Sequence, residues 1–384
     1  MYERRIIVYL MDENYYELKH KQYLTKLREL LKQLPPYCGE FMRGIENNTS
    51  VLTRYGYAVD LRTFFQFLVS DGAFAGLNSD IRSITLEQLD ALKIVDFELF
   101  IEYVTYYIHG DKETINKERA KARKLATLRS FYKYFYKKGM LNNTPPALVD
   151  LPKIHQKNII RLEPDEIARL LDTAQDGGSL SAGQKKYHQY TRLRDVAILT
   201  LFLGTGIRIS ELVGVNLEDV NFMADEFCIT RKGGNQDILA FGAETRSALL
   251  NYMKEREAIT SLPGHEAALF LSIQRKRISV RAVENLVKKY AALAAPLKTI
   301  TPHKLRSTYG TMLYRETGDI YLVADVLGHK DVNTTRKHYA AISEDRRRLA
   351  AKVIKLREDD ERITNSGQPE KPEKSEQPCQ TDGA

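Results

Sequence analysis

Apolar residues recur at helical spacing through the first 150 residues of the chain. Between residues 15 and 34, leucines at intervals of three and four predict an amphipathic helix that Pro35 and Pro36 should end. Capping residues and glycine stops bound further helices in the same way. The predicted helices cover residues 15–34, the stretch between the caps at 48–50 and the stop at 71–72, a short helix opened by Thr85–Gln88, and a helix from Asp96 to His109–Gly110.

Residues 112–138 combine an apolar stripe with a strongly basic face, and we predict one helix over this range. Ten Lys or Arg stand against two Glu, while Leu125, Leu128 and Phe131 recur at helical intervals. A solvated helix surface would explain such charge, yet the scarcity of compensating acids favours phosphate binding. The candidate DNA contacts on this helix are Lys121, Arg123, Lys124, Arg129 and Lys133.

A proline-rich, basic stretch divides the chain. We predict an all-helical domain over residues 1–150, a linker over 151–160, an α+β domain over 161–355 and a disordered acidic tail over 356–384. The fold as a whole is predicted to be mainly α. In the second domain we expect a helix start at Glu163–Glu166, a polar loop over 176–190, a buried helix over 192–203 ending at Gly204–Gly206, and short strands at 227–230, 238–241 and 268–271, the first two forming a hairpin.

Charge and cysteine content narrow the class of protein. The 384 residues carry a net charge of +8, and the tail contributes −4, so residues 1–355 hold +12. Cys38, Cys228 and Cys379 lie far apart without CxxC spacing, which argues against a disulfide framework and a zinc cluster. The first apolar run stops at Asp12, too early for a signal sequence, and no run reaches the ~18 to 20 apolar residues that span a bilayer. We expect a cytoplasmic protein.

Several catalytic motifs are missing from the sequence. It has no GxxxxGK[ST] loop, which disfavours an ATP-driven motor, and Gly204–Gly206 lacks the third glycine of a dinucleotide fingerprint. HExxH, an ordered carboxylate set and Gly-x-Ser-x-Gly are also absent. We therefore expect neither a metal nor a cofactor.

Basic and phenolic residues instead follow one another in a defined order. An arginine precedes an acid by three residues; a lysine in the predicted hairpin turn, a His-x-x-Arg box, a Leu-Gly-His and a tyrosine follow. They are Arg208, Glu211, Lys232, His303, Arg306, His329 and Tyr339. This order, with Thr334–Thr335 ahead of the tyrosine, resembles the tyrosine recombinase (phage integrase) family. The resemblance covers residues 163–339, and the helical N-terminal part resembles the core-binding domain of that family.

The resemblance implies metal-free and ATP-free cleavage of DNA by a covalent nucleophile. Tyr339 would attack the phosphodiester and leave a 3′-phosphotyrosyl linkage with a free 5′-hydroxyl. Negative charge on the pentavalent phosphorane needs neutralising, and the guanidinium forks of Arg208 and Arg306 suit phosphate geometry. Glu211 would orient Arg208. An ordinary helix-start ion pair between these two residues is compatible with the same role.

The remaining candidates would move protons or donate hydrogen bonds. His303 and His329 can donate to the non-bridging oxygens, and an imidazole can help move the phenolic proton. Lys232 is suited to protonating the departing 5′ oxygen. Arg231 competes with Lys232 as the charge of the turn, and the register, lysine directly before glycine, favours Lys232.

Tyr339 has other tyrosines near it in the sequence, and the sequence departs from the common family pattern at two places. Tyr309, Tyr314 and Tyr321 lie within helical patterns, and we interpret them as packing residues. Ser307 follows Arg306 where many family members have histidine, and Tyr339 lies ten residues after His329, one more than in typical Xer-type members. Neither departure removes a catalytic group.

The resemblance also implies how the protein works in an assembly. Two domains would form a C-shaped clamp on double-stranded DNA, and four copies would pair two core sites and exchange strands through a Holliday junction. A helix over residues 343–356 would dock on a neighbouring protomer. DNA-bending or excisionase proteins are compatible partners, and Xer-type dimer resolution and movement of a mobile element both stay open. The alternatives are a type IB topoisomerase and a DNA-binding relative that has lost catalysis.

Overall fold

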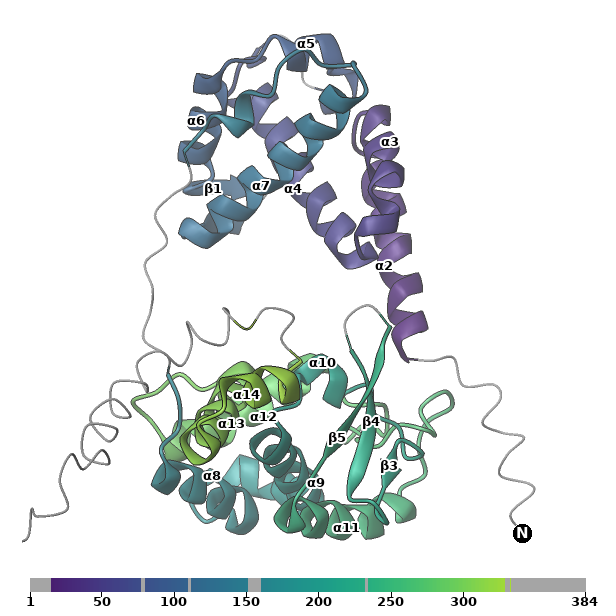
Figure 1. Ribbon diagram of the computed structural model, residues 1–384, viewed down its shortest axis with the longest axis vertical. Coiled ribbons are helices and arrows are strands. Elements are labelled where there is room, and N and C mark those ends of the chain that lie inside the picture. The colour runs from purple at the N-terminus through teal and green to yellow at the C-terminus, as the bar shows by residue number, and fades with distance from the viewer. Residues whose placement is uncertain are drawn as a thin grey trace, which may run out of the picture. The chain divides into compact units, whose positions relative to one another are not determined.

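A computed structural model describes residues 15–76, 80–109, 112–150, 160–231, 234–328 and 332 of the chain. The described residues are mainly helical, as predicted, and they include two small antiparallel sheets, of which only the one in the second half was predicted (Figure 1). The chain divides into two compact units, residues 1–309 and 310–384, and one helix runs through this boundary. Among the described residues, no helix is both long and apolar enough to cross a membrane.

The first 150 residues form a set of helices around an aromatic core. Ser50 starts one helix by accepting a hydrogen bond from the Thr53 amide at 3.3 Å, and Thr85 and Gln88 cap another reciprocally, as predicted. Phe64 and Phe131 are fully buried in this core, where the rings pack mainly edge to face. The helices are α2 (Tyr15–Leu31), α3 (Pro36–Gly44), α4 (Val51–Ser70), α5 (Leu86–Asp90), α6 (Ile94–Tyr103) and α7 (Glu118–Lys137), with the 3-10 turns η1 (Glu46–Asn48), η2 (Ile81–Ser83) and η3 (Pro145–Ala147).

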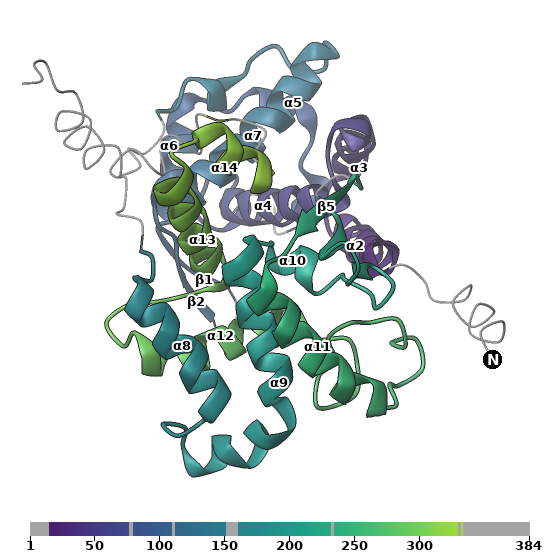
Figure 2. The same ribbon diagram turned by 60° about the horizontal axis from the view of Figure 1, so that its bottom comes forward.

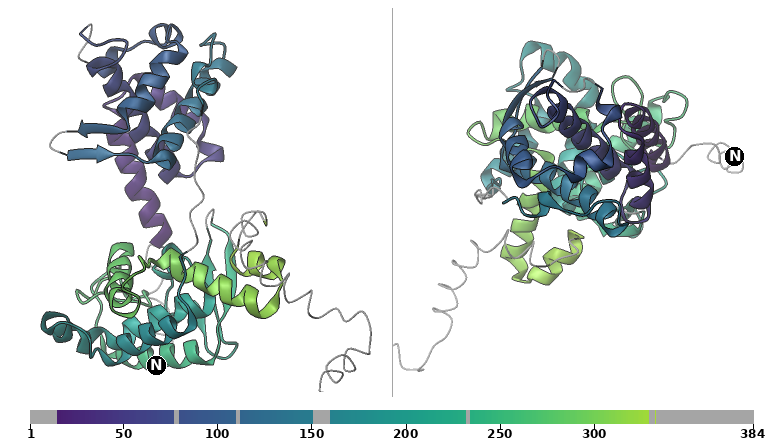
Figure 3. Two further views of the ribbon diagram at one scale, coloured as in Figure 1. Left: turned by 90° about the vertical axis from the view of Figure 1, so that its left-hand side faces the viewer. Right: turned by 90° about the horizontal axis from the view of Figure 1, so that it is seen from above.

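A β-hairpin interrupts this helical part, so the prediction of an all-helical N-terminal domain was wrong in detail. The strands β1 (Tyr106–His109) and β2 (Lys112–Ile115) pair antiparallel, with Tyr106 opposite Ile115, and the left view of Figure 3 shows them in blue beside the helices. The helix predicted to reach His109 therefore ends at Tyr103. The basic helix α7 begins at Glu118 rather than at Lys112.

The second half builds its own apolar core around the helix α9, which packs against the helices α8 and α11 (Figure 2). Phe202 and Ile198 of α9 are fully buried. The elements are α8 (Pro164–Asp176), α9 (Ala182–Thr205), α10 (Ile209–Leu212), β3 (Val220–Asn221), β4 (Glu226–Thr230), β5 (Gln236–Ala240), α11 (Ala243–Ala258), α12 (Val280–Ala294), α13 (Pro302–Thr317) and α14 (Ile320–Val326).

Two local predictions for this half were wrong. Residues 182–190, predicted as loop, form the first turns of α9, which Ser181 opens by accepting a hydrogen bond from the Gln184 amide at 3.3 Å. The third strand of the sheet is β3 rather than residues 268–271, which make only isolated bridges. The predicted hairpin itself is confirmed: β4 and β5 pair antiparallel from Glu226 opposite Ala240 to Thr230 opposite Gln236.

Candidate active site

Arg208 stands at the start of α10, fixed by the carboxylate of Glu211. Gly206 has a φ of 62°, a left-handed conformation that lets the chain leave α9 and turn sharply into α10. The Arg208 amide donates to Glu211 Oε2 at 2.9 Å, and Arg208 Nη1 donates to Glu211 Oε1 at 2.8 Å. The Glu211 side chain is 3% exposed and that of Arg208 is 33% exposed. The predicted orienting role of Glu211 fits this geometry, because the buried acid holds an arginine that still reaches solvent.

The other end of α10 is held by Arg277. Its Nη1 lies 3.1, 3.2 and 3.1 Å from the carbonyl oxygens of Val213, Gly214 and Val215, and its Nη2 donates to Asn216 Oδ1 at 2.6 Å. These bonds hold the three residues that follow α10, and the Val215 carbonyl also accepts from the Leu269 amide at 3.1 Å. The short helix that carries Arg208 is thus fixed at both ends.

Arg306 approaches the same turn from α13. Its side chain is buried, and Nη1 donates to the Gly206 carbonyl at 2.5 Å. The Thr308 hydroxyl, two residues later, accepts a hydrogen bond from the Leu162 amide at 3.0 Å and ties α13 to the segment before α8. Arg306, 98 positions after Arg208 in the sequence, therefore binds the turn that leads into Arg208.

His303 also lies on α13, three residues before Arg306, as the spacing predicted. The histidine is exposed whereas the arginine is buried. An exposed imidazole beside a buried guanidinium is an arrangement that a DNA phosphate could contact from solvent. The histidine's role in catalysis stays a prediction.

Three predicted catalytic residues, Lys232, His329 and Tyr339, lie outside the described residues, as do the linker residues 151–159 and residues 333–384. The structure describes the segments next to two of them. The Arg231 amide donates to the Asn235 carbonyl at 2.7 Å and closes the β4–β5 loop around position 232. The helix α14 ends at Val326, and Gly328, with a φ of 56°, precedes His329.

The other tyrosines of this region differ in exposure. Tyr309 is partly buried in α13, and burial raises the pKa of its phenol. Tyr314 is also partly buried on the same helix. Tyr321 of α14 is 71% exposed, so its interpretation as a packing residue was wrong. Tyr321, an exposed tyrosine 18 positions before Tyr339 in the sequence, offers a comparison for it.

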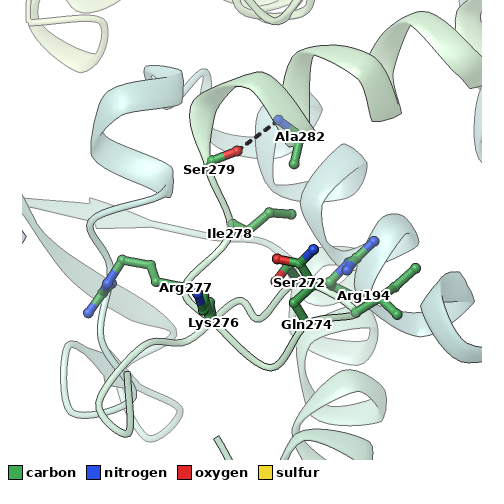
Figure 4. Close-up of a pocket in the computed structure, with 9 residues that line it drawn as sticks. Arg194, Ser272, Gln274, Lys276, Arg277, Ile278, Ser279 and Ala282 are labelled. Atoms are coloured by element: carbon green, nitrogen blue, oxygen red, sulfur yellow. Dashed lines mark hydrogen bonds between the residues drawn. The ribbon is translucent and has the colours of Figure 1, made fainter. Parts of the chain in front are cut away.

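A cavity of about 450 Å³ lies near the N-terminus of α12, as Figure 4 shows. Its arginines already have partners in the fold: Arg194 donates to the Leu271 carbonyl at 2.9 Å and to Asp195, and Arg277 holds the end of α10. Ser279 caps α12 by accepting from the Ala282 amide at 3.1 Å, the dashed line in Figure 4. We therefore interpret the residues that line this cavity as structural, because their guanidiniums bind carbonyls of the fold. No His, Cys, Asp or Glu cluster suited to a metal ion occurs among the described residues.

Of the five predicted DNA contacts on α7, three have partners within the fold and two stay predicted contacts. Lys124 is buried with its Nζ 3.3 Å from Asp60, and Arg129 donates to the Pro146 and Val149 carbonyls at 2.8 and 2.5 Å, so both have partners within the fold. Arg123 pairs with Asp60 as well, although half of its side chain is exposed. Lys121 is partly buried and Lys133 is exposed, and these two stay predicted contacts.

We expect Asp60→Ala to destabilise the protein strongly. The buried Asp60 carboxylate accepts hydrogen bonds from Arg123, Lys124 and Thr127, and removing it leaves the Lys124 ammonium buried without its counter-ion. Breaking such a pair costs about 3–5 kcal/mol of unfolding free energy. Urea unfolding of the full chain, followed by circular dichroism, measures the loss. Glu29→Ala, which removes an exposed partner of Lys32, is the control, and equal effects of the two variants would contradict the prediction.

Comparison with known proteins agrees with this site. Residues 160–346 match the sequence model of the Phage integrase family. Tyrosine recombinase XerC from Caldanaerobacter subterraneus subsp. tengcongensis is 33% identical over 336 residues, which cover 84% of this chain and 87% of that protein. XerC from Syntrophus aciditrophicus is 31% identical and covers 83% of this chain and 94% of its own length. The chain therefore belongs to the tyrosine recombinase family and is a site-specific recombinase of the tyrosine type.

A solved structure supports the fold. The crystal structure of XerH bound to a palindromic difH substrate, a post-cleavage complex, matches 80% of this chain and 81% of that chain with a TM-score of 0.59 at 20% identity. The match extends over most of the chain, so it includes both the helical N-terminal part and the second half.

Proposed function

We propose that Tyr339 cleaves one strand of a double-stranded core site while Arg208 and Arg306 neutralise the phosphorane. The observation that carries this proposal is that the Arg306 guanidinium binds the Gly206 carbonyl, two residues before Arg208, whose own guanidinium is fixed by Glu211. Two fixed cationic forks can hold the non-bridging oxygens of one phosphate without a metal ion.

The remaining groups move protons in this proposal. The tyrosine oxygen forms a bond to phosphorus, the bond from phosphorus to the 5′ oxygen breaks, and that oxygen gains a proton from Lys232. The phenolic proton passes to an imidazole, for which His303 and His329 are the candidates. The phosphotyrosyl bond conserves the energy of the phosphodiester, so rejoining by a 5′-hydroxyl needs no ATP.

We further propose how this chemistry is organised. Residues 1–150 form the core-binding domain, residues 151–160 the linker and residues 161–355 the catalytic domain, and the two domains enclose DNA as a clamp. Two separate hydrophobic cores, from Leu27 to Val149 and from Leu162 to Leu305, support that division. Four copies would pair two sites and exchange strands through a Holliday junction in the cytoplasm. The likeness to XerC supports an Xer-type reaction between two short sites over insertion of a mobile element.

A covalent-capture experiment tests this function and separates it from relaxation by a type IB topoisomerase. Sheared genomic DNA of the source organism is incubated with the protein, and DNA that stays attached after denaturation is sequenced to find the site. We expect a plasmid with two copies of that site to recombine and one with a single copy not to do so. Relaxation of supercoiled plasmids that lack the site would favour the topoisomerase, and no captured DNA would favour a binding protein without catalysis.

A further inference from the structure

Arg231 is the residue before Lys232, and the structure turns its side chain inward. The side chain is only 11% exposed, although the residue directly follows the last residue of β4 at the mouth of a surface loop. An arginine that served merely as a loop charge would extend into water. Burial of this guanidinium therefore requires partners, and the structure provides two acids.

The two acids belong to different elements. Arg231 Nε donates to Asp237 Oδ2 at 2.7 Å across the hairpin, on the neighbouring strand β5. Arg231 Nη1 lies 3.8 Å from Glu211 Oε1, the oxygen that also accepts from Arg208 Nη1 at 2.8 Å. The Glu211 carboxylate thus lies between the catalytic arginine and the arginine at the base of the hairpin loop.

The backbone of Arg231 closes the loop at the same point. Its amide donates to the Asn235 carbonyl at 2.7 Å, and its carbonyl accepts from the Gly234 amide at 3.1 Å. The residue that closes the loop is therefore also the one whose guanidinium reaches toward α10. A shift of the loop relative to α10 would have to break the contact of Arg231 with Glu211.

We propose that Arg231 is a positioning residue that couples the loop carrying Lys232 to the Glu211–Arg208 pair. This inference rests on the proposed function, in which Lys232 protonates the leaving 5′ oxygen. We expect loss of the Arg231 guanidinium to free the base of the loop from α10 and to slow the step that needs the proton donor. The phosphate still meets Arg208 and Arg306, because Glu211 keeps its two hydrogen bonds from Arg208.

A sulfur-substituted substrate separates this role from a general structural one. The captured site is made as a nicked suicide duplex in two forms, one with oxygen and one with sulfur at the bridging 5′ position of the scissile phosphate. A thiolate leaves without needing a proton, so the sulfur duplex bypasses the proton donor. We expect Arg231→Ala to form adduct about 10- to 100-fold more slowly than wild type on the oxygen duplex and at a near wild-type rate on the sulfur duplex.

Three further variants serve as controls for this result, and a fourth tests a contact of Arg231. Lys232→Ala should show the same rescue by sulfur, and Arg208→Ala should be slow on both duplexes. Arg246→Ala removes an arginine paired with Asp225 at the opposite end of the β4–β5 hairpin and should match wild type on both. Asp237→Asn, which weakens only the contact within the hairpin, should give a smaller defect that sulfur also rescues, and it replaces Arg231→Ala if that variant does not fold.

The possible outcomes distinguish two failures. If wild type forms no adduct on either duplex, the proposed function fails. If wild type cleaves and Arg231→Ala is equally slow on both duplexes, or equal to wild type on the oxygen duplex, Arg231 does not position the proton donor. Rescue confined to the sulfur duplex, with an unchanged circular dichroism melt, supports the inference.

Discussion

Tyr339→Phe is expected to abolish the covalent protein–DNA adduct while leaving site binding unchanged. The substitution removes one oxygen, the atom that would bond to phosphorus, and keeps the ring. Arg208, Arg306 and their partners are untouched, so the affinity for the phosphate should persist. Adduct on a nicked suicide duplex, resolved on a denaturing gel, reports the chemistry, and a mobility shift of the intact duplex reports binding.

The neighbouring tyrosines provide the controls for this prediction. Tyr321→Phe alters an exposed phenol on α14, and Tyr309→Phe alters a phenol whose pKa is raised by burial, so that less of it is ionised at neutral pH. Both variants should form adduct at the wild-type rate. Adduct from Tyr339→Phe, or its loss in Tyr321→Phe alone, would show that the nucleophile is misassigned. Mass spectrometry of the DNA-linked peptide identifies the tyrosine directly.

The sequence predicted long helices with clear caps well and short elements poorly. Ser50 and the Thr85–Gln88 box lie where the pattern placed them, because capping depends on residues within one turn. The strands β1 and β2 have only four residues each, and four residues are too few to separate a period of 2 from a period of 3.6. The proline pair at 35–36 was interpreted only as the end of a helix. Pro36 also begins the next helix, α3, because proline is favoured at the first helical position.

In the candidate site, too, the sequence predicted contacts between residues close in the chain but not contacts between distant residues. Arg208 with Glu211, and His303 with Arg306, were predictable because each pair is three residues apart in one helix. The inward side chain of Arg231 was not, since it depends on an acid twenty positions away. Lys124 gave no sign of burial either, because its partner Asp60 lies on another helix. Local spacing therefore identifies the chemistry, and tertiary contacts decide which charges remain available for DNA.

Loss of either Arg208 or Arg306, the two proposed catalytic arginines, is expected to slow cleavage by about 10²- to 10³-fold, as removal of one charge-stabilising donor does in other enzymes. The two arginines should differ in their structural cost. Arg208→Ala removes a side chain that is one-third exposed, and Glu211 keeps the amide of residue 208 and the guanidinium of Arg231. Its melting temperature should fall by less than that of Arg306→Ala.

Arg306→Ala should lose stability as well as rate. The Arg306 side chain is buried, and its removal leaves a cavity and deprives the Gly206 carbonyl of a donor at the turn between α9 and α10. Single-turnover cleavage of the suicide duplex measures the rate, and circular dichroism melts measure the stability. Arg306→Lys keeps the charge but not the fork, so it should restore part of the stability and little of the rate. Wild-type cleavage by Arg306→Ala, or a larger drop in melting temperature for Arg208→Ala, would contradict this division of roles. The same turn thus explains why loss of Arg208 should affect mainly the chemistry, whereas Arg306 also holds the backbone that presents Arg208.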